Sequence, residues 1–120
     1  MFDLARYGGA EELAAQVDAG LPVNLTNSQG DTLLILAAYH KQADVVRALL
    51  DRGADLDRAN DRGQTALASA VFRQDGEIVQ MLLESGADRT AGRQSAVATA
   101  EFFDLPEMVA LLEGGTPAEG

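Results

Sequence analysis

The chain lacks most of the side chains that carry chemistry at protein sites. Its 120 residues include no cysteine, no tryptophan and a single histidine, His40. The absence of cysteine excludes disulfide frameworks, thiol catalysis and cysteine-rich zinc sites. Aromatic residues make up 5% of the sequence, and no apolar run approaches the ~20 residues that a membrane-spanning helix needs. We therefore expect neither a cysteine-based site nor a membrane partner.

Basic residues are also scarce. The sequence has nine Lys and Arg residues against 19 Asp and Glu residues, which gives a formal net charge of -10. Acidic residues spread along the chain argue against nucleic acid as a partner, because phosphate-backbone binding needs a clustered basic face. The same net charge favours a partner protein with a basic surface. The first residues lack the apolar stretch of a secretory signal, so we expect a cytoplasmic protein, and the excess of Arg over Lys is typical of GC-rich bacterial genomes.

The chain does contain an internal repeat. Gly20, Gly53 and Gly86 are each 33 residues apart, and the sequence Gly-Ala-Asp at 53–55 returns at 86–88. Further positions repeat at the same offset: Asn27, Gly30, Thr32, Leu34 and Ala37 match Asn60, Gly63, Thr65, Leu67 and Ala70. The flanking segments carry weaker copies, and the last copy follows at an offset of 30, so its junction is three residues short. A period of this length indicates stacked structural units.

Each unit predicts two helices and a projecting loop. Apolar residues recur at helical spacing over 32–40 and again over 44–52, which predicts two amphipathic helices. Thr32 suits the N-cap of the first helix. Gly53 stands where the second helix ends, because glycine adopts the left-handed conformation of a helix terminus without strain. The segment Asn60-Asp61-Arg62-Gly63 predicts a tight turn in a polar loop.

This pattern resembles the ankyrin repeat, whose signature runs D-x-x-G-x-T-P-L-H-x-A-A, then a helix that ends in L-L, then G-A-D. The resemblance implies an all-α ankyrin-repeat solenoid of about four stacked helix-turn-helix units with projecting hairpin-like loops, in one domain over 1–120. The expected units are 3–26, 27–59, 60–92 and 93–113, the outer two being caps, and 114–120 is expected to form a flexible tail. The family's Pro-Leu-His is replaced by Leu33-Leu34-Ile35 and by Ala66-Leu67-Ala68. We expect this replacement to cost about 1 kcal/mol per lost hydrogen bond without changing the architecture.

No motif of a known enzyme class is present. His40 is the single imidazole, and its solvent-facing position near the end of the first helix favours a surface or partner-contact role over catalysis. The acidic pairs Asp55/Asp57 and Asp18/Asp51 could suggest a metal site or an acid-base site. Acids at repeat-equivalent positions are, however, typical of solvated loops and outer helices. We therefore predict that the chain is not an enzyme and that it holds no metal and no cofactor.

Aromatic and arginine residues gather at one pair of positions in each unit. The pair follows the Ala-Ala site near the end of the first helix and contains Arg6-Tyr7, Tyr39-His40, Phe72-Arg73 and Phe102-Phe103. Five of the six aromatic residues fall there. The resemblance places this pair on the concave groove, where half-exposed rings would form a patch of roughly 400–600 Å². Alternatively, the rings pack against one another and cover the helix ends.

The resemblance implies a protein–protein interaction module that binds through its concave groove and loop tips. We expect a monomer that recognises another protein by surface complementarity on a rigid stack. The candidate partner-binding residues are Tyr7, Tyr39, His40, Phe72, Arg73, Phe102, Gln29, Asp31, Asp61, Arg62 and Gln64. An operon-encoded regulator, or an immunity- or inhibitor-type protein that acts by binding, is the alternative. An enzyme that uses His40 and carboxylates is less favoured.

Overall fold

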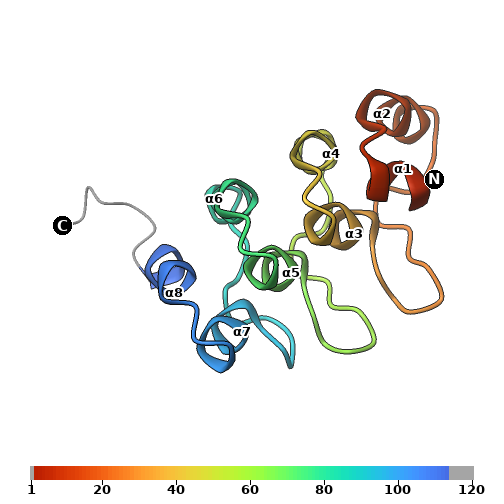
Figure 1. Ribbon diagram of the computed structural model, residues 1–120. Coiled ribbons are helices and arrows are strands. Elements are labelled where there is room, and N and C mark those ends of the chain that lie inside the picture. The colour runs from red at the N-terminus through yellow and green to blue at the C-terminus, as the bar shows by residue number, and fades with distance from the viewer. Residues whose placement is uncertain (1, 114–120) are drawn as a thin grey trace.

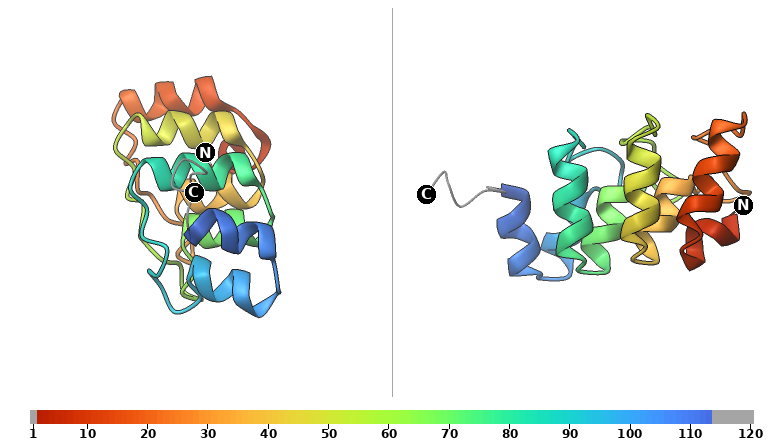
Figure 2. Two further views of the ribbon diagram at one scale, coloured as in Figure 1. Left: turned by 90° about the vertical axis from the view of Figure 1, so that its left-hand side faces the viewer. Right: turned by 90° about the horizontal axis from the view of Figure 1, so that it is seen from above.

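The computed structural model of the protein describes residues 2–113, which form four successive pairs of helices. The helices are α1 (Phe2–Tyr7), α2 (Ala10–Asp18), α3 (Leu33–Tyr39), α4 (Ala43–Leu50), α5 (Ala66–Phe72), α6 (Gly76–Glu84), α7 (Ala96–Phe102) and α8 (Pro106–Glu113). The odd-numbered helices form one row, here called the inner row, and the even-numbered helices form the outer row (Figure 1). The helices of each row lie side by side along the stack (Figure 2). The expected all-α repeat solenoid is confirmed, while the predicted tail, 114–120, lies outside the described residues.

Hydroxyl side chains start the inner helices. Thr32, Thr65 and Ser95 occupy the N-cap positions of α3, α5 and α7. Each hydroxyl oxygen accepts a hydrogen bond from the backbone N–H three residues further on, at 3.0 to 3.2 Å. The predicted N-cap at Thr32 is thus confirmed. Because a cap of this kind contributes about 1 kcal/mol, the inner helices begin at defined residues without the proline that the ankyrin signature carries there.

The short turn inside each unit uses left-handed backbone. Lys41, Gln74 and Asp104 have φ values of 61°, 57° and 53°, and Gly8 occupies the equivalent position of the first unit with a φ of 93°. A non-glycine residue in this conformation costs about 1 kcal/mol. A turn was predicted here, but its left-handed backbone was not, because three of the four units have no glycine there to mark it. The positive φ predicted at Gly53, after α4, is confirmed at 79°.

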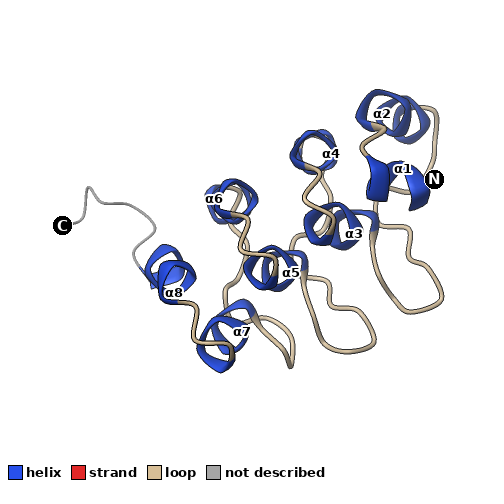
Figure 3. Ribbon diagram, in the orientation of Figure 1, coloured by secondary structure: helices blue, strands red, loops and turns tan. Residues whose placement is uncertain are grey.

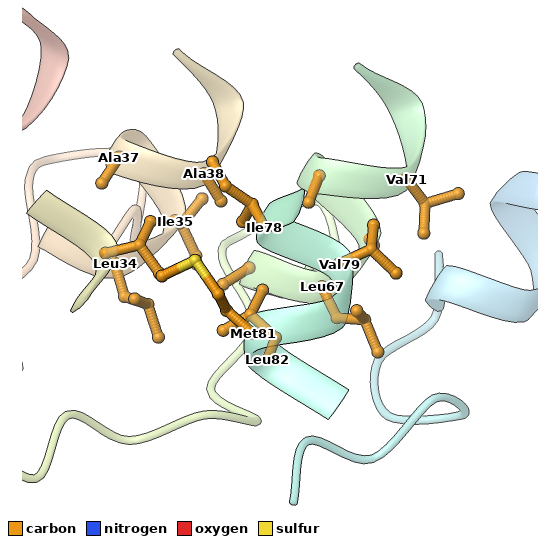
Figure 4. Close-up of a cluster of buried hydrophobic side chains, with 14 of the residues drawn as sticks. Leu34, Ile35, Ala37, Ala38, Leu67, Val71, Ile78, Val79, Met81 and Leu82 are labelled. Atoms are coloured by element: carbon orange, nitrogen blue, oxygen red, sulfur yellow. The ribbon is translucent and has the colours of Figure 1, made fainter. Parts of the chain in front are cut away.

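Apolar side chains fill the space between the two rows and between successive units (Figure 4). Leu34 and Leu67 of the inner row, and Val79 and Leu82 of the outer row, are at most 1% exposed. Alanines of α3 and α5 are also buried, and their small side chains let the inner helices approach closely. Burying one such Leu or Val contributes about 1.5–3 kcal/mol. The stack is therefore held by a core that no single unit could form.

The loops project from the inner row and are tied to one another across units. The backbone N–H of Asp61 donates to the carbonyl of Gln29, and that of Gln94 donates to the carbonyl of Gly63, both at 3.0 Å. The N–H of Gly63 donates to the carbonyl of Asn60 at 2.9 Å, which confirms the predicted tight turn. Within residues 2–113 the loops contain no regular strand (Figure 3). Loop 85–95 is shorter than loop 51–65, as the missing residues at its junction predict (Figure 1).

Candidate functional site

Within residues 2–113, three hollows lie between the inner row and the projecting loops. The first, of about 220 Å³, is bordered by α1, α3, α5 and the loops 19–32 and 51–65. The second, of about 140 Å³, shares Tyr39, Arg62, Gln64 and Ser69 with the first. The third, of about 370 Å³, lies at α7 and loop 85–95. We call the three hollows together the inner groove.

Rings from three successive units line the inner groove in a row. Tyr39 and Phe72 are stacked, with ring centroids 6.2 Å apart and planes 9° from parallel, and Phe72 meets Phe103 edge-on at 5.3 Å. We call Tyr39, Phe72 and Phe103 the aromatic row. The three side chains are 39%, 42% and 49% exposed. The sequence left two alternatives, an exposed patch in the groove or rings packed against one another. Both apply, because the rings pack against one another and still present 39% to 49% of their surface to solvent.

The remaining two rings of the predicted stripe lie toward its ends and are more exposed. Tyr7 is 77% exposed and Phe102 is 81% exposed. Phe102 meets Phe103 edge-on at 4.8 Å and lines the third hollow with it. Phe103 was aligned with the stripe but was not among the candidate residues. Its equivalence to Arg73 and His40 in the repeat alignment was the signal that could have added it.

Arg73 and His40 both rest against Tyr39. The Nη1 of Arg73 donates to the backbone carbonyl of Tyr39 at 3.0 Å, and its guanidinium carbon lies 5.0 Å from the Tyr39 ring centroid. This cation–π contact contributes about 0.5–1 kcal/mol at an exposed site. The His40 ring meets Tyr39 edge-on at 5.2 Å. Burial lowers the pKa of His40, and the charges of Arg6 and Arg73 lower it further, which favours the neutral imidazole.

The loop candidates divide into an exposed group and one buried residue. Gln29, Asp61 and Arg62 are exposed and Gln64 is half-buried. Asp31, in contrast, is only 6% exposed. Its carboxylate accepts hydrogen bonds from the side-chain amides of Asn60, at 2.8 Å, and Asn27, at 3.3 Å. Since Asp31 follows the turn and points into the stack, it ties two loops together, and we leave it out of the proposed binding surface.

Comparison with known proteins agrees with this architecture. A family model described as "Ankyrin repeats (3 copies)" matches residues 2–92. The chain belongs to the ankyrin-repeat family. It is also similar to a Pseudomonas aeruginosa protein that is named as an ankyrin repeat protein, with 53% identity over 47 residues. That match covers 39% of this chain and 28% of the Pseudomonas protein, so the chain spans only part of that protein's length.

Ankyrin repeats are generally protein–protein interaction modules and typically carry no catalysis. In the part of the chain that the structure describes, none of the helices is long and apolar enough to cross a membrane. The same residues hold no group of three or more His, Asp or Glu side chains that could bind a metal ion.

The charge of the ankyrin groove differs from that of the rest of the chain. Four of the eight arginines, Arg6, Arg62, Arg73 and Arg93, line the groove or stand against its aromatic row. The outer helices α2, α4, α6 and α8 carry eight Asp and Glu residues and a single basic residue, Arg47. A chain of net charge -10 thus has a locally basic face. Arg6 was aligned with the aromatic stripe and Arg93 was not, and neither was among the candidate residues.

Proposed function

We propose that the chain binds a partner protein through the inner groove and the loop tips, without catalysis. The observation that carries this proposal is the aromatic row, whose rings are 39% to 49% exposed beside the hollows. Large exposed rings are uncommon on a surface that has no partner, and aromatic residues and Arg are enriched where interfaces gain most of their energy. The row supplies apolar contact area, and Arg73 supplies a donor and a charge beside it.

The groove is already formed before any partner arrives. The rings are fixed by their contacts with one another, and the loops are fixed by hydrogen bonds such as Asp61 N–H to Gln29 O at 3.0 Å. Binding therefore orders few side chains, which lowers its entropic cost. The exposed side chains of Gln29, Asp61 and Arg62 at the loop tips would form the polar rim of the interface. We expect the free chain to be monomeric and cytoplasmic.

Two further aspects of the partner follow from the sequence. The net charge of -10 still favours a partner with a basic surface, which would meet the acidic outer helices and raise the association rate at low salt. A regulator, or an immunity- or inhibitor-type protein encoded beside its target, would use the same surface by the same chemistry. The gene neighbourhood separates these biological roles, because the binding surface does not differ between them.

Capture of a partner by the wild type and by two variants tests the proposal. In the Tyr39→Ala/Phe72→Ala variant, we expect affinity to fall by about 2–4 kcal/mol, the range typical of central interface residues. The control is Glu77→Ala/Glu84→Ala on α6, whose side chains are exposed on the outer row. Calorimetric titration of the captured partner gives the affinities, and circular dichroism establishes that each variant is folded. Equal affinity of the wild type and the aromatic variant would contradict binding through the groove.

A further inference from the structure

Building on the proposed function, we propose that the inner groove binds an acidic peptide segment of its partner, in which carboxylates flank an apolar or aromatic side chain. Arginines line or adjoin the groove from its first hollow to its third, beginning with Arg6 in α1 and ending with Arg93 beside α7. Rings of the aromatic row lie beside them. A segment that carries negative charge and one large apolar group matches both features.

Most of the groove's positive charge is left unneutralised within the chain. In residues 2–113 the ion pairs are Arg6 with Asp3, at 3.0 Å, and Arg52 with Asp18, at 2.9 Å. Arg73 and Arg93 instead donate to backbone carbonyls, those of Tyr39 and Asp61, at 3.0 and 2.9 Å. Such bonds orient a guanidinium but leave its charge in place. A carboxylate from a partner would provide the bidentate acceptor that the guanidinium group is shaped for.

Among the described residues that line the three hollows, Asp31 is the one acidic side chain. Asp31 lines the first hollow, but it is 6% exposed and accepts hydrogen bonds from Asn60 and Asn27. Asp61 is exposed at the loop tip. Its backbone N–H donates to the carbonyl of Gln29, and its carbonyl accepts a hydrogen bond from Arg93, so its backbone bonds to both neighbouring loops. Arg6 is the one groove arginine that pairs with a carboxylate in the described residues. The free positive charge is therefore concentrated at Arg62, Arg73 and Arg93.

The surroundings of His40 agree with positive charge in the first hollow. His40 lines the first hollow and rests against Tyr39. After burial, the causes that lower the pKa of His40 are the charges of Arg6 and Arg73. A site that disfavours protonation of an imidazole through positive charge is a site that favours an anion. The apolar part of the ligand fits the third hollow, the largest of the three at about 370 Å³, where Phe102 and Phe103 lie beside Arg93.

The distribution of charge selects a peptide rather than a nucleic acid. A polyanion that extends beyond the groove would approach the eight acidic residues of the outer helices and would be repelled. A short acidic segment can be confined to the groove. A basic surface elsewhere on the same partner, where it faces the outer helices, is compatible with an acidic segment in the groove.

Four probes test the proposal by calorimetric titration of the full chain. They are a peptide of alternating Glu and Ser with a central Phe, its Lys-for-Glu and Gln-for-Glu counterparts, and single-stranded oligothymidylate. We expect the Glu peptide to bind about tenfold or more tightly than the Gln peptide. Its affinity should fall between about 0.01 M and about 0.15 M salt, as the Debye length shortens from about 30 Å to about 8 Å. The Lys peptide and the oligonucleotide should not bind.

Arg62→Gln is the decisive variant, because the Arg62 side chain is exposed at the loop tip and lines two of the hollows. It should weaken binding of the Glu peptide about tenfold, whereas Arg47→Gln, an exposed arginine on α4, should leave binding unchanged. Thermal unfolding establishes that both variants keep the wild-type stability. A loss in both variants, or in neither, overturns a specific role for the groove charge.

The other outcomes separate this inference from the proposed function. The proposal of an acidic segment is overturned if the Lys peptide or oligothymidylate binds as tightly as the Glu peptide. It is also overturned if the Glu peptide does not bind at concentrations up to about 1 mM. A captured partner can be used in the same way: if Tyr39→Ala/Phe72→Ala abolishes its binding and Arg62→Gln does not, the proposal of an acidic segment is overturned. Protein binding through the groove then stands. If neither variant changes the affinity for the partner, binding through the groove is contradicted.

Discussion

Between the two helix rows, Leu34, Leu67, Val46 and Val79 are at most 1% exposed, whereas along the inner groove the rings of the aromatic row are 39% to 49% exposed. These four buried positions keep the same residue type from one unit to the next, since Leu34 matches Leu67 and Val46 matches Val79. The groove positions change, from Tyr39 to Phe72 and from His40 to Arg73. Each core side chain must fit its equivalent in the neighbouring unit, while a groove side chain needs only to leave the stack intact.

This comparison separates the residues that hold the stack from those that remain available to a partner. The core residues contribute by being removed from water, and each is surrounded on all sides. The side chains of the aromatic row are only about half removed from water, and their ring–ring contacts add about 0.5–1.5 kcal/mol per pair. A substitution in the core should therefore change the stability first, and a substitution in the groove should change the affinity first.

Leu67→Ala should give the largest effect. Leu67 is fully buried in α5, so its truncation leaves a cavity and should lower the free energy of unfolding by about 2–5 kcal/mol. Chemical denaturation measures the loss. Phe72→Ala is the matched comparison, because it removes a larger side chain from the same helix but one that is 42% exposed. If Phe72→Ala destabilised the chain as much as Leu67→Ala, the division between core and groove would not hold.

Asp31→Ala should give an intermediate effect, although Asp31 lines the groove. The substitution removes the nearer of two acceptors of the Asn60 side-chain amide, Asp31 at 2.8 Å, and leaves Gln64 at 3.3 Å. Loss of a buried hydrogen bond of this kind costs about 1–3 kcal/mol. Asp61→Ala, at an exposed position on the adjacent loop tip, should stay within about 0.5 kcal/mol of the wild type. Urea unfolding of both variants checks this. Equal stability of the two would show that Asp31 does not tie the loops and belongs with the binding residues.

Gln74→Gly should give the smallest effect and the opposite sign. Gln74 has a φ of 57° in the turn that leads from the inner row to the outer row, and its side chain is exposed. Glycine relieves the left-handed strain and should raise the free energy of unfolding by about 0.5–1 kcal/mol, with no change in partner affinity. Gln74→Ala retains the strain and serves as the control. A thermal melt in which Gln74→Gly was no more stable than Gln74→Ala would count against strain at this turn.

Much of the fold was predictable because it is encoded over short stretches of sequence. The N-cap at Thr32, the turn at Asn60 to Gly63 and the left-handed Gly53 after α4 each depend on a few neighbouring residues with definite conformational preferences. The left-handed turn at Lys41 and Gln74 was missed for the same reason, since neither residue type marks that conformation. There the packing of the two helices imposes the backbone angle, and the local preference is overridden.

Little of the candidate site could be read from the sequence, because it depends on contacts between units. The repeat alignment placed Tyr39, Phe72 and Phe103 at one pair of positions, but only the stacked structure shows them packed on one another and exposed together. It did not predict that Asp31 is buried by a bond to the next loop. It also did not bring Arg6, Arg62 and Arg93 together, since their spacing does not follow the period.

The sequence by itself determined the repeat, the ends of its helices and the apolar faces that make the units stack. These features arise from residue preferences and spacings within 33 residues. Only the tertiary structure decided which side chains the stack covers and which charges it brings side by side. Exposure and electrostatic potential depend on neighbours that are a full unit or more away along the chain. For that reason a chain of net charge -10 can present a basic, aromatic groove.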